Sequence, residues 1–264
     1  MASERDIRRE IAAVCRRIYE KGLVAATDGN VSVRLDERRI LVTPSGLSKG
    51  DVTEQNVILC DRAGKKIAGE LDPSSEIRLH LAVYDERPDV RAVVHAHPPV
   101  ATAFTIAGVT LAEMVIPEVV VTLGTIPTAE YATPASAEGP LVIRKYIHNY
   151  DALLLDRHGT LTVGKTPWEA YFKLEKVEHA ALIQFLARQM GNVRRLSPDE
   201  LKRLVSASEQ RGVTAKLELY ADSGGVKMPG ETRSEVTPEV VEMVTREVLK
   251  MLSGDGEKAG KGAE

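Results

Sequence analysis

The chain has 264 residues, of which 43% are hydrophobic and 28% charged, a composition typical of a protein that buries an apolar core. Its 35 basic and 38 acidic residues give a net charge of −3, so no basic excess favours nucleic acid or an anionic membrane as a partner. The two cysteines, Cys15 and Cys60, are too few for a disulfide framework or a cysteine-based zinc module. Because no apolar run approaches the roughly 18–20 residues of a membrane span and the charged N-terminus does not resemble a signal peptide, we expect a soluble, cytoplasmic protein.

The first part of the chain predicts two helices separated by short strands. An amphipathic helix is expected from Ser3, as N-cap, to Gly22, as C-cap. A second helix is expected to start near Ser74 and to end at Tyr84. Between them, β-branched stretches separated by polar turns predict antiparallel strands at 31–35, 40–43 and 57–60.

The second part begins with a buried strand over 91–97, which two prolines end. Thr166-Pro167 is expected to open a long helix through about Gln189, with threonine as N-cap and proline at the first helical position. The remaining predicted elements are a helix over 137–149, a strand over 152–156, and helices over 198–209 and 238–252.

Strands and helices are interleaved, but several consecutive strands have no crossover helix between them. This pattern favours a single α/β layered domain with a largely antiparallel sheet over a doubly wound parallel one. The last dozen residues are poor in hydrophobic side chains and are predicted to be disordered.

Three histidines form the sharpest chemical feature. His95 and His97 are two residues apart in a predicted strand, so both side chains project from one face and can approach one ion. His158 follows another predicted strand and precedes a glycine, which allows a sharp turn. Three histidines with an open position are typical of a catalytic zinc site. The simpler alternative is a set of histidines that titrate and bind nothing.

Glu76 lies at the predicted start of a helix, after Ser74 and Ser75, where backbone N–H groups favour an anion such as phosphate. A glutamate in a first turn also has a purely structural interpretation, because it favours the helix dipole. His80 is four residues further on the same face, so a Glu76–His80 metal pair is conceivable. We favour the three histidines as ligands and expect His80 to be a packing residue or to support the ligands.

Two further turns combine hydroxyl or amide side chains with glycine. Residues 27–30 (TDGN) precede a strand and residues 43–46 (TPSG) follow one. Such turns often form backbone nests for phosphate, although each alone is an ordinary turn. With Ser74 and Ser75 they provide three small polar segments for one phosphate group.

Five motifs, in order, resemble the class II aldolase/adducin family over roughly residues 5–212. They are GNVSVR (29–34), TPSG (43–46), PSSE (73–76), VVHAHPP (93–99) and RHG (157–159). The resemblance implies a three-layer α/β/α domain, usually assembled as a homotetramer with active sites at subunit interfaces. It divides the chain into a catalytic domain at 1–212, an extension with one helix at 213–252 and a disordered tail at 253–264.

The resemblance also implies roles for individual residues. The metal ligands would be Glu76, His95, His97 and His158, with Zn²⁺ as the expected ion and Co²⁺, Mn²⁺ or Fe²⁺ as alternatives. Glu76 would also act as the general acid and base. The substrate phosphate would be held by Thr27, Asn30, Ser45, Gly46, Ser74 and Ser75.

The activity implied is that of a fuculose-phosphate aldolase type of enzyme. It would reversibly cleave a ketose 1-phosphate to dihydroxyacetone phosphate and an aldehyde, with the metal stabilising the negative charge on the substrate. Two active-site tyrosines of those aldolases fall here on Ile116 and on about Arg211. Glu118 or Tyr131 could replace them as proton donor.

Other reactions of the family remain open. Ribulose-phosphate 4-epimerases have a motif similar to PSSD where this chain has PSSE at 73–76, so Glu76 favours an aldolase. A methylthioribulose 1-phosphate dehydratase or a sugar-acid phosphate decarboxylase would use the same metal and phosphate site. An adducin-like, non-catalytic scaffold should have lost the metal ligands, which this chain keeps. Metal-dependent hydrolysis is a further alternative, although no H-E-x-x-H motif is present.

Overall fold

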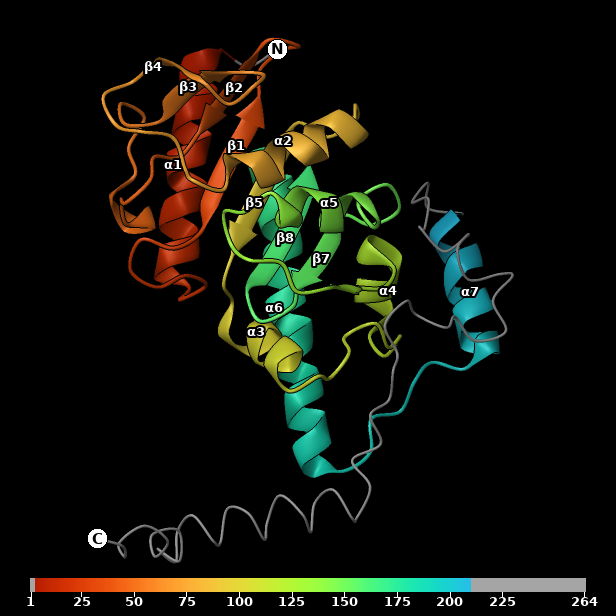
Figure 1. Ribbon diagram of the computed structural model, residues 1–264. Coiled ribbons are helices and arrows are strands. Elements are labelled where there is room, and N and C mark those ends of the chain that lie inside the picture. Colours follow the sequence, from red (N-terminus) through yellow and green to blue (C-terminus); the bar gives the residue numbers. More distant parts are fainter. Residues whose placement is uncertain (1–2, 210–264) are drawn as a thin grey trace, which may run out of the picture. The chain divides into compact units, whose positions relative to one another are not determined.

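The computed structural model describes residues 3–209, and a single mixed sheet of eight strands organises this part of the chain (Figure 1). The strands are β1 (Asn30–Arg34), β2 (Arg39–Val42), β3 (Ile58–Asp61), β4 (Lys66–Ala68), β5 (Ala92–Ala96), β6 (Thr128–Ala129), β7 (Ala152–Leu155) and β8 (Gly159–Gly164). Their order is β4-β3-β2-β1-β5-β8-β7-β6. Neighbours are antiparallel except β6 and β7, which confirms the largely antiparallel sheet.

Helices cover both faces of this sheet. They are α1 (Glu4–Glu20), α2 (Ile77–Glu86), α3 (Pro99–Ile106), α4 (Pro117–Leu123), α5 (Glu138–Arg144), α6 (Pro167–Met190) and α7 (Pro198–Glu209), with a short 3-10 helix η1 (Lys49–Asp51). One apolar core joins α1 and α6 to the sheet, and a second core joins α2 and α5 to its other face. Figure 1 shows α2 and α5 in front of the central strands and α6 behind them. The described residues therefore form the predicted three-layer α/β/α domain.

Capping explains where the two longest helices begin. The Ser3 side chain accepts a hydrogen bond from the backbone N–H of Asp6, whose carboxylate accepts one from the Ser3 backbone in return, a capping box. Thr166 accepts from the N–H of Glu169, and Pro167 occupies the first helical position of α6. Both helix starts were predicted from these residues, and both are confirmed.

The second predicted helix begins later than expected. Instead of starting near Ser74, α2 starts at Ile77, because residues 74–76 form a turn. The Ser74 carbonyl accepts from the N–H of Ile77, and its hydroxyl accepts from the N–H of Glu76. Glu76 therefore occupies the N-cap position of α2 and not its first turn.

Other differences concern short or turn-rich segments. The helix predicted over 137–149 ends at Arg144, since residues 145–149 continue as turns with 3-10-type hydrogen bonds. The strands β4, β6 and β8 and the helices α3 and α4 were not predicted. The helix predicted over 238–252, the proposed extension and the tail lie outside the described residues.

The pairing of β1 with β5 positions the site. Asn30 lies opposite His95 and Ser32 opposite Val93 in an antiparallel register. Because side chains alternate along a strand, Val31 and Val94 face the α1–α6 core, while Ser32 and His95 face α2. In the part of the chain that the structure describes, no helix is long and apolar enough to cross a membrane.

Candidate metal centre and substrate site

The three predicted histidines lie together at one edge of the central sheet. His95 is on β5, His97 lies just beyond its end, and His158 lies in the turn between β7 and β8. One potential ligand atom from each ring lies within 4.8 Å of the other two. The Nε2 atoms of His95 and His97 are 3.0 Å apart. The strand ends therefore bring together side chains more than 60 residues apart in sequence.

The turn that carries His158 depends on a close backbone approach. Arg157 has a left-handed backbone, with φ of 55°, and its N–H donates to the Thr105 hydroxyl at 3.0 Å. A Cβ on Gly159 would collide with the carbonyl of Ala96 and lie 2.8 Å from Cδ2 of His97. Only glycine leaves room for the two chain segments to meet here.

Hydrogen bonds on the outer side of the cluster orient two of the rings. Nδ1 of His95 lies 2.8 Å from the carbonyl oxygen of Thr160. A carbonyl only accepts, so Nδ1 carries the proton and Nε2 presents a lone pair to the cluster. Nδ1 of His97 lies 3.4 Å from the carboxylate of Asp28, which favours the same tautomer. Both rings are thus prepared to coordinate a metal through Nε2.

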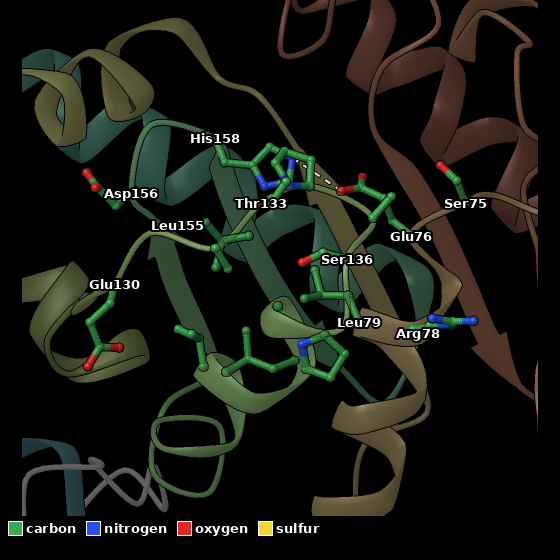
Figure 2. A pocket seen from close by; sticks show the side chains of 17 residues that line it. Ser75, Glu76, Arg78, Leu79, Glu130, Thr133, Ser136, Leu155, Asp156 and His158 are labelled. Carbon is green, nitrogen blue, oxygen red and sulfur yellow. Dashed lines mark ion pairs between the residues drawn. The ribbon is translucent and has the colours of Figure 1, made fainter.

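Glu76 projects from the start of α2 into the same cluster. Its Oε2 lies 3.2 Å from Nε2 of His95. Its Oε1 lies 3.3 Å from Nε2 of His158, and Figure 2 shows these two side chains directed toward each other. The side-chain amide of Asn30 donates to Oε2 at 3.0 Å. Burial acts to raise the pKa of Glu76, but the adjacent rings of His158 and His95 outweigh it and hold the pKa well below its ordinary value. The carboxylate is therefore ionised at neutral pH.

The donor set fits a divalent metal ion. Burial, with repulsion from His95 and His158, lowers the pKa of His97 to about 4, so its ring is neutral at pH 7, as coordination requires. Neutral imidazoles and one carboxylate are the ligands that zinc and its first-row neighbours prefer. The cluster can thus hold a divalent ion with Glu76 as a fourth ligand or as a base beside it.

His80 lies outside this cluster. It is fully buried, and its Nδ1 is 2.6 Å from the hydroxyl of Ser32, which also lies 2.7 Å from the hydroxyl of Tyr84. Burial lowers the pKa of His80 to about 3. His80 is therefore a neutral packing residue behind the site, as the sequence favoured.

The three small polar turns lie side by side. The N–H of Ser45 donates to the carbonyl of Asp72, and the N–H of Ser74 donates to the carbonyl of Thr43. Residues 43–46 and 72–75 are thereby joined through their backbones, and a bridge links Pro44 to Pro73. The first turn, at 27–30, is joined to the second through Lys49, whose ammonium donates to the carbonyl of Thr27 and to that of Leu47, directly after the second turn. Ser45, Gly46 and Ser75 are exposed at this point, and Asn30 and Ser74 are buried beneath them.

A cavity opens beside the histidine cluster, between α2 and the segment that leads into α5 (Figure 2). Glu76 and His158 line the end that adjoins the cluster, and Arg78 and Glu130 also line the cavity. The segment 132–136 completes the wall. Sequence reasoning missed this wall, as it missed Asp28 and Lys49, because nothing in the linear pattern connects these residues to the histidines.

The positions considered in connection with the two tyrosines lie on different segments of the chain. Ile116 is the N-cap of α4, and Glu118 is in the first turn of that helix. Tyr131 is 55% exposed and adjoins Glu130 of the cavity wall. Arg211 lies beyond the described residues.

Comparisons with known proteins agree with this geometry. Residues 9–185 match the family model of the class II aldolase and adducin N-terminal domain. An L-fuculose phosphate aldolase of Methanococcus maripaludis is 33% identical over 181 residues, which cover 69% of this chain and 97% of that protein. A 3-oxo-tetronate 4-phosphate decarboxylase of Haemophilus influenzae is 31% identical over 201 residues, covering 75% of this chain and 93% of that protein.

Among solved structures, YgbL from Klebsiella pneumoniae superimposes with a TM-score of 0.71 at 28% identity, covering 77% of this chain and 100% of that one. The five sequence motifs, the layered fold and the histidine cluster thus agree with the family match. The chain belongs to the class II aldolase and adducin family.

Proposed function

We propose that the protein is a zinc-dependent aldolase that reversibly cleaves a ketose 1-phosphate to dihydroxyacetone phosphate and an aldehyde. The observation that carries the proposal is the position of Glu76, whose two carboxylate oxygens lie 3.2 and 3.3 Å from Nε2 of His95 and of His158. A carboxylate in this position can bind a metal or exchange a proton with a substrate that the metal binds.

His95, His97, His158 and Glu76 would hold the metal. Zinc is the ion we expect, with cobalt, manganese or iron as alternatives that the same ligands tolerate. When bound, the ion would act as a Lewis acid that stabilises negative charge developing on the substrate oxygens. The hydrogen bonds from His95 to Thr160 and from Asn30 to Glu76 keep the ligand atoms directed inward.

Glu76 would move the proton. In the condensation direction it would remove a proton from the carbon beside the ketone. In the cleavage direction the substrate hydroxyl releases a proton as it becomes the aldehyde carbonyl, and Glu76 would take up one proton and return it to that carbon. Its lowered pKa keeps it ionised, which is the form required of a base. The amide of Asn30 holds Oε2, so Oε1, which lies 3.3 Å from Nε2 of His158, is the oxygen that would reach the substrate.

The phosphate group would bind where the three polar turns meet. Thr27, Asn30, Ser45, Gly46, Ser74 and Ser75 lie on these turns. Contacts to a group remote from the reacting carbon provide binding energy that fixes the orientation of that carbon. The cavity lined by Arg78 and Glu130 would receive the other end of the substrate.

A decarboxylase is the second candidate, because a relative at 31% identity is named 3-oxo-tetronate 4-phosphate decarboxylase. In both reactions the bond that breaks is a carbon–carbon bond of the carbon next to the ketone, and in the decarboxylase that bond leads to the carboxylate. Loss of carbon dioxide leaves the same dihydroxyacetone phosphate, so one metal and one phosphate site would serve both reactions. The two activities differ only in the co-product, an aldehyde or carbon dioxide.

We propose further that the enzyme is a homotetramer with active sites at subunit interfaces. The helix α6 supports this assembly, since six of its large apolar side chains are between 38% and 87% exposed, and exposed apolar side chains gathered on one element often mark an interface. The six are Phe172, Leu182, Ile183, Phe185, Leu186 and Met190. Residues 1–212 would form the catalytic domain, with residues 213–252 as an extension.

The test is an assay of product release with metal-loaded and chelator-treated protein. A panel of ketose 1-phosphates, including fuculose and 5-deoxyribulose 1-phosphates, is compared with 3-oxo-tetronate 4-phosphate. Metal-dependent release of dihydroxyacetone phosphate together with an aldehyde would support the aldolase. Release together with carbon dioxide would favour the decarboxylase. No release from any of them, with metal bound, would contradict both reactions.

A further inference from the structure

Lys49 is a buried cation at the junction of two of the polar turns. Its side chain is only 1% exposed, and Nζ donates to the carbonyl of Thr27 at 3.1 Å and to the carbonyl of Leu47. The first carbonyl belongs to the turn at 27–30, and the second belongs to Leu47, the residue that follows the turn at 43–46. The ammonium therefore connects the two turns and has a third N–H that meets no acceptor among the described residues.

The surroundings of Lys49 do not balance its charge. Among the described residues, no carboxylate forms an ion pair with it. The nearby thiol of Cys15 is neutral, because burial raises its pKa to about 12. Asp28 is the carboxylate that attracts the ammonium, but it is half exposed and directed to His97. The charge thus faces two carbonyls, a neutral thiol and the adjoining turns.

A buried ammonium without an ionic partner destabilises a fold. Burial accordingly lowers the pKa of Lys49. A neutral donor such as a side-chain amide could satisfy the two carbonyls without burying a charge. The retention of a charge beneath two exposed turns is understandable if an anion binds above them.

We propose that Lys49 is the buried counter-charge of the substrate's phosphate: it joins the turns at 27–30 and 43–46 and makes their junction selective for a dianionic phosphoryl group. This role rests on the proposed function, because it assigns the phosphate to these turns. Lys49 is a positioning residue here, since it acts through the turns and their electrostatic potential and not through contact with the reacting carbon.

The test is the affinity of the metal-loaded protein for inorganic phosphate, measured by calorimetry on the full chain. Lys49→Gln keeps hydrogen-bond donors for the two carbonyls but removes the charge, and Lys49→Arg keeps the charge. We expect Lys49→Gln to weaken phosphate binding by about tenfold or more and Lys49→Arg to retain most of the affinity. Bound metal per chain should be equal in all variants, so phosphate bound directly by the metal contributes equally to each.

Lys173 provides the matched control. It is also largely buried, but its ammonium pairs with Asp151 and Glu169, away from the turns. Lys173→Gln should lower thermal stability and leave phosphate affinity within about twofold. Equal phosphate affinity of Lys49→Gln and wild type, with metal bound in both, would overturn the proposal.

The same experiment separates this proposal from the proposed function. If the wild type binds phosphate and Lys49→Gln does not, the role of Lys49 stands even when no ketose phosphate is cleaved. If the wild type cleaves a ketose phosphate and Lys49→Gln has an unchanged KM for it, the function stands and the role of Lys49 is wrong. A specific role also requires that KM rises more than kcat falls, because a general loss of structure would reduce the metal content and kcat together.

Discussion

The two faces of the same pair of strands differ sharply. On β1 and β5, the residues that face α1 and α6 are apolar, with Val31 and Val94 fully buried among aliphatic side chains. The face toward α2 contains the apolar Val93, but also two polar residues that are equally buried: Ser32 and His95 are both 0% exposed. Burial therefore does not distinguish the faces, and hydrogen bonding does.

Each polar side chain on the second face has a specific partner. The hydroxyl of Ser32 joins His80 to Tyr84, and Nδ1 of His95 is held by Thr160. Buried polar groups are tolerated when such partners are present and are costly when one is removed. On β1 and β5, the face toward α1 and α6 contributes apolar packing. The face toward α2 combines apolar packing with hydrogen bonds that hold a reactive cluster in place.

The largest difference should appear when two neighbouring residues that face opposite sides of the sheet are each replaced by alanine. We expect His95→Ala to lose nearly all bound metal and lower activity by about a thousandfold or more, because a central ligand is gone. Val94→Ala should keep its metal and lose about 1–3 kcal/mol of stability through a cavity next to α6. Metal analysis and denaturant unfolding of both variants check the contrast, and metal retained at full stoichiometry in His95→Ala would contradict it.

Within the polar face, Glu76 can be tested separately from the histidines. Glu76→Gln keeps the size and the hydrogen-bonding capacity of the side chain but removes the base, so kcat should fall by about 10²–10⁴-fold. The affinity for inorganic phosphate should change little, since the polar turns are untouched. Glu54→Gln, at a carboxylate paired with Arg9 on α1, is the control and should have normal kcat. Full turnover by Glu76→Gln would exclude the acid–base role.

Sequence reasoning identified the histidine cluster because local signals mark it. The spacing of His95 and His97 on a strand, and the glycine after His158, are readable without a structure. The layered fold followed from strands that lack crossover helices between them. The strand β8 was missed because residues 159–164 follow a tight turn with a left-handed backbone at Arg157. No residue type in the sequence predicts that conformation for an arginine. The roles of Asp28 and Lys49 were missed because each depends on a contact that only the folded chain makes. Asp28 approaches His97, and Lys49 donates to two backbone carbonyls.

The pH dependence of stability should also reveal the polar face. The pKa of His80 is lowered to about 3 by burial, whereas in the unfolded chain it is about 6.5. The unfolded state therefore binds the proton first, and the free energy of unfolding should fall as pH decreases from about 6.5 toward 3, by about 1.4 kcal/mol per pH unit from this residue. Above pH 6.5 its contribution is constant.

His80→Leu isolates this contribution, since the leucine cannot titrate while Ser32 keeps its contact with Tyr84. Urea unfolding of chelator-treated protein at several pH values measures both slopes, and the other histidines contribute equally to each. We expect a smaller slope in His80→Leu between pH 6.5 and 3. Equal slopes would mean that His80 is accessible to protons in the folded state.

The smallest of these effects should come from the hydroxyl between His80 and Tyr84. Ser32→Ala leaves Nδ1 of His80 and the hydroxyl of Tyr84 buried without that partner, which should cost about 1–3 kcal/mol. Tyr84→Phe removes one contact and leaves Ser32 with His80, so it should cost less, about 1 kcal/mol. Because both changes remove the Ser32–Tyr84 contact, the double variant should be less destabilised than the sum of the two single variants. Strict additivity would show that the three side chains do not act as one network, and that the polar face is held by Thr160 and Asn30 alone.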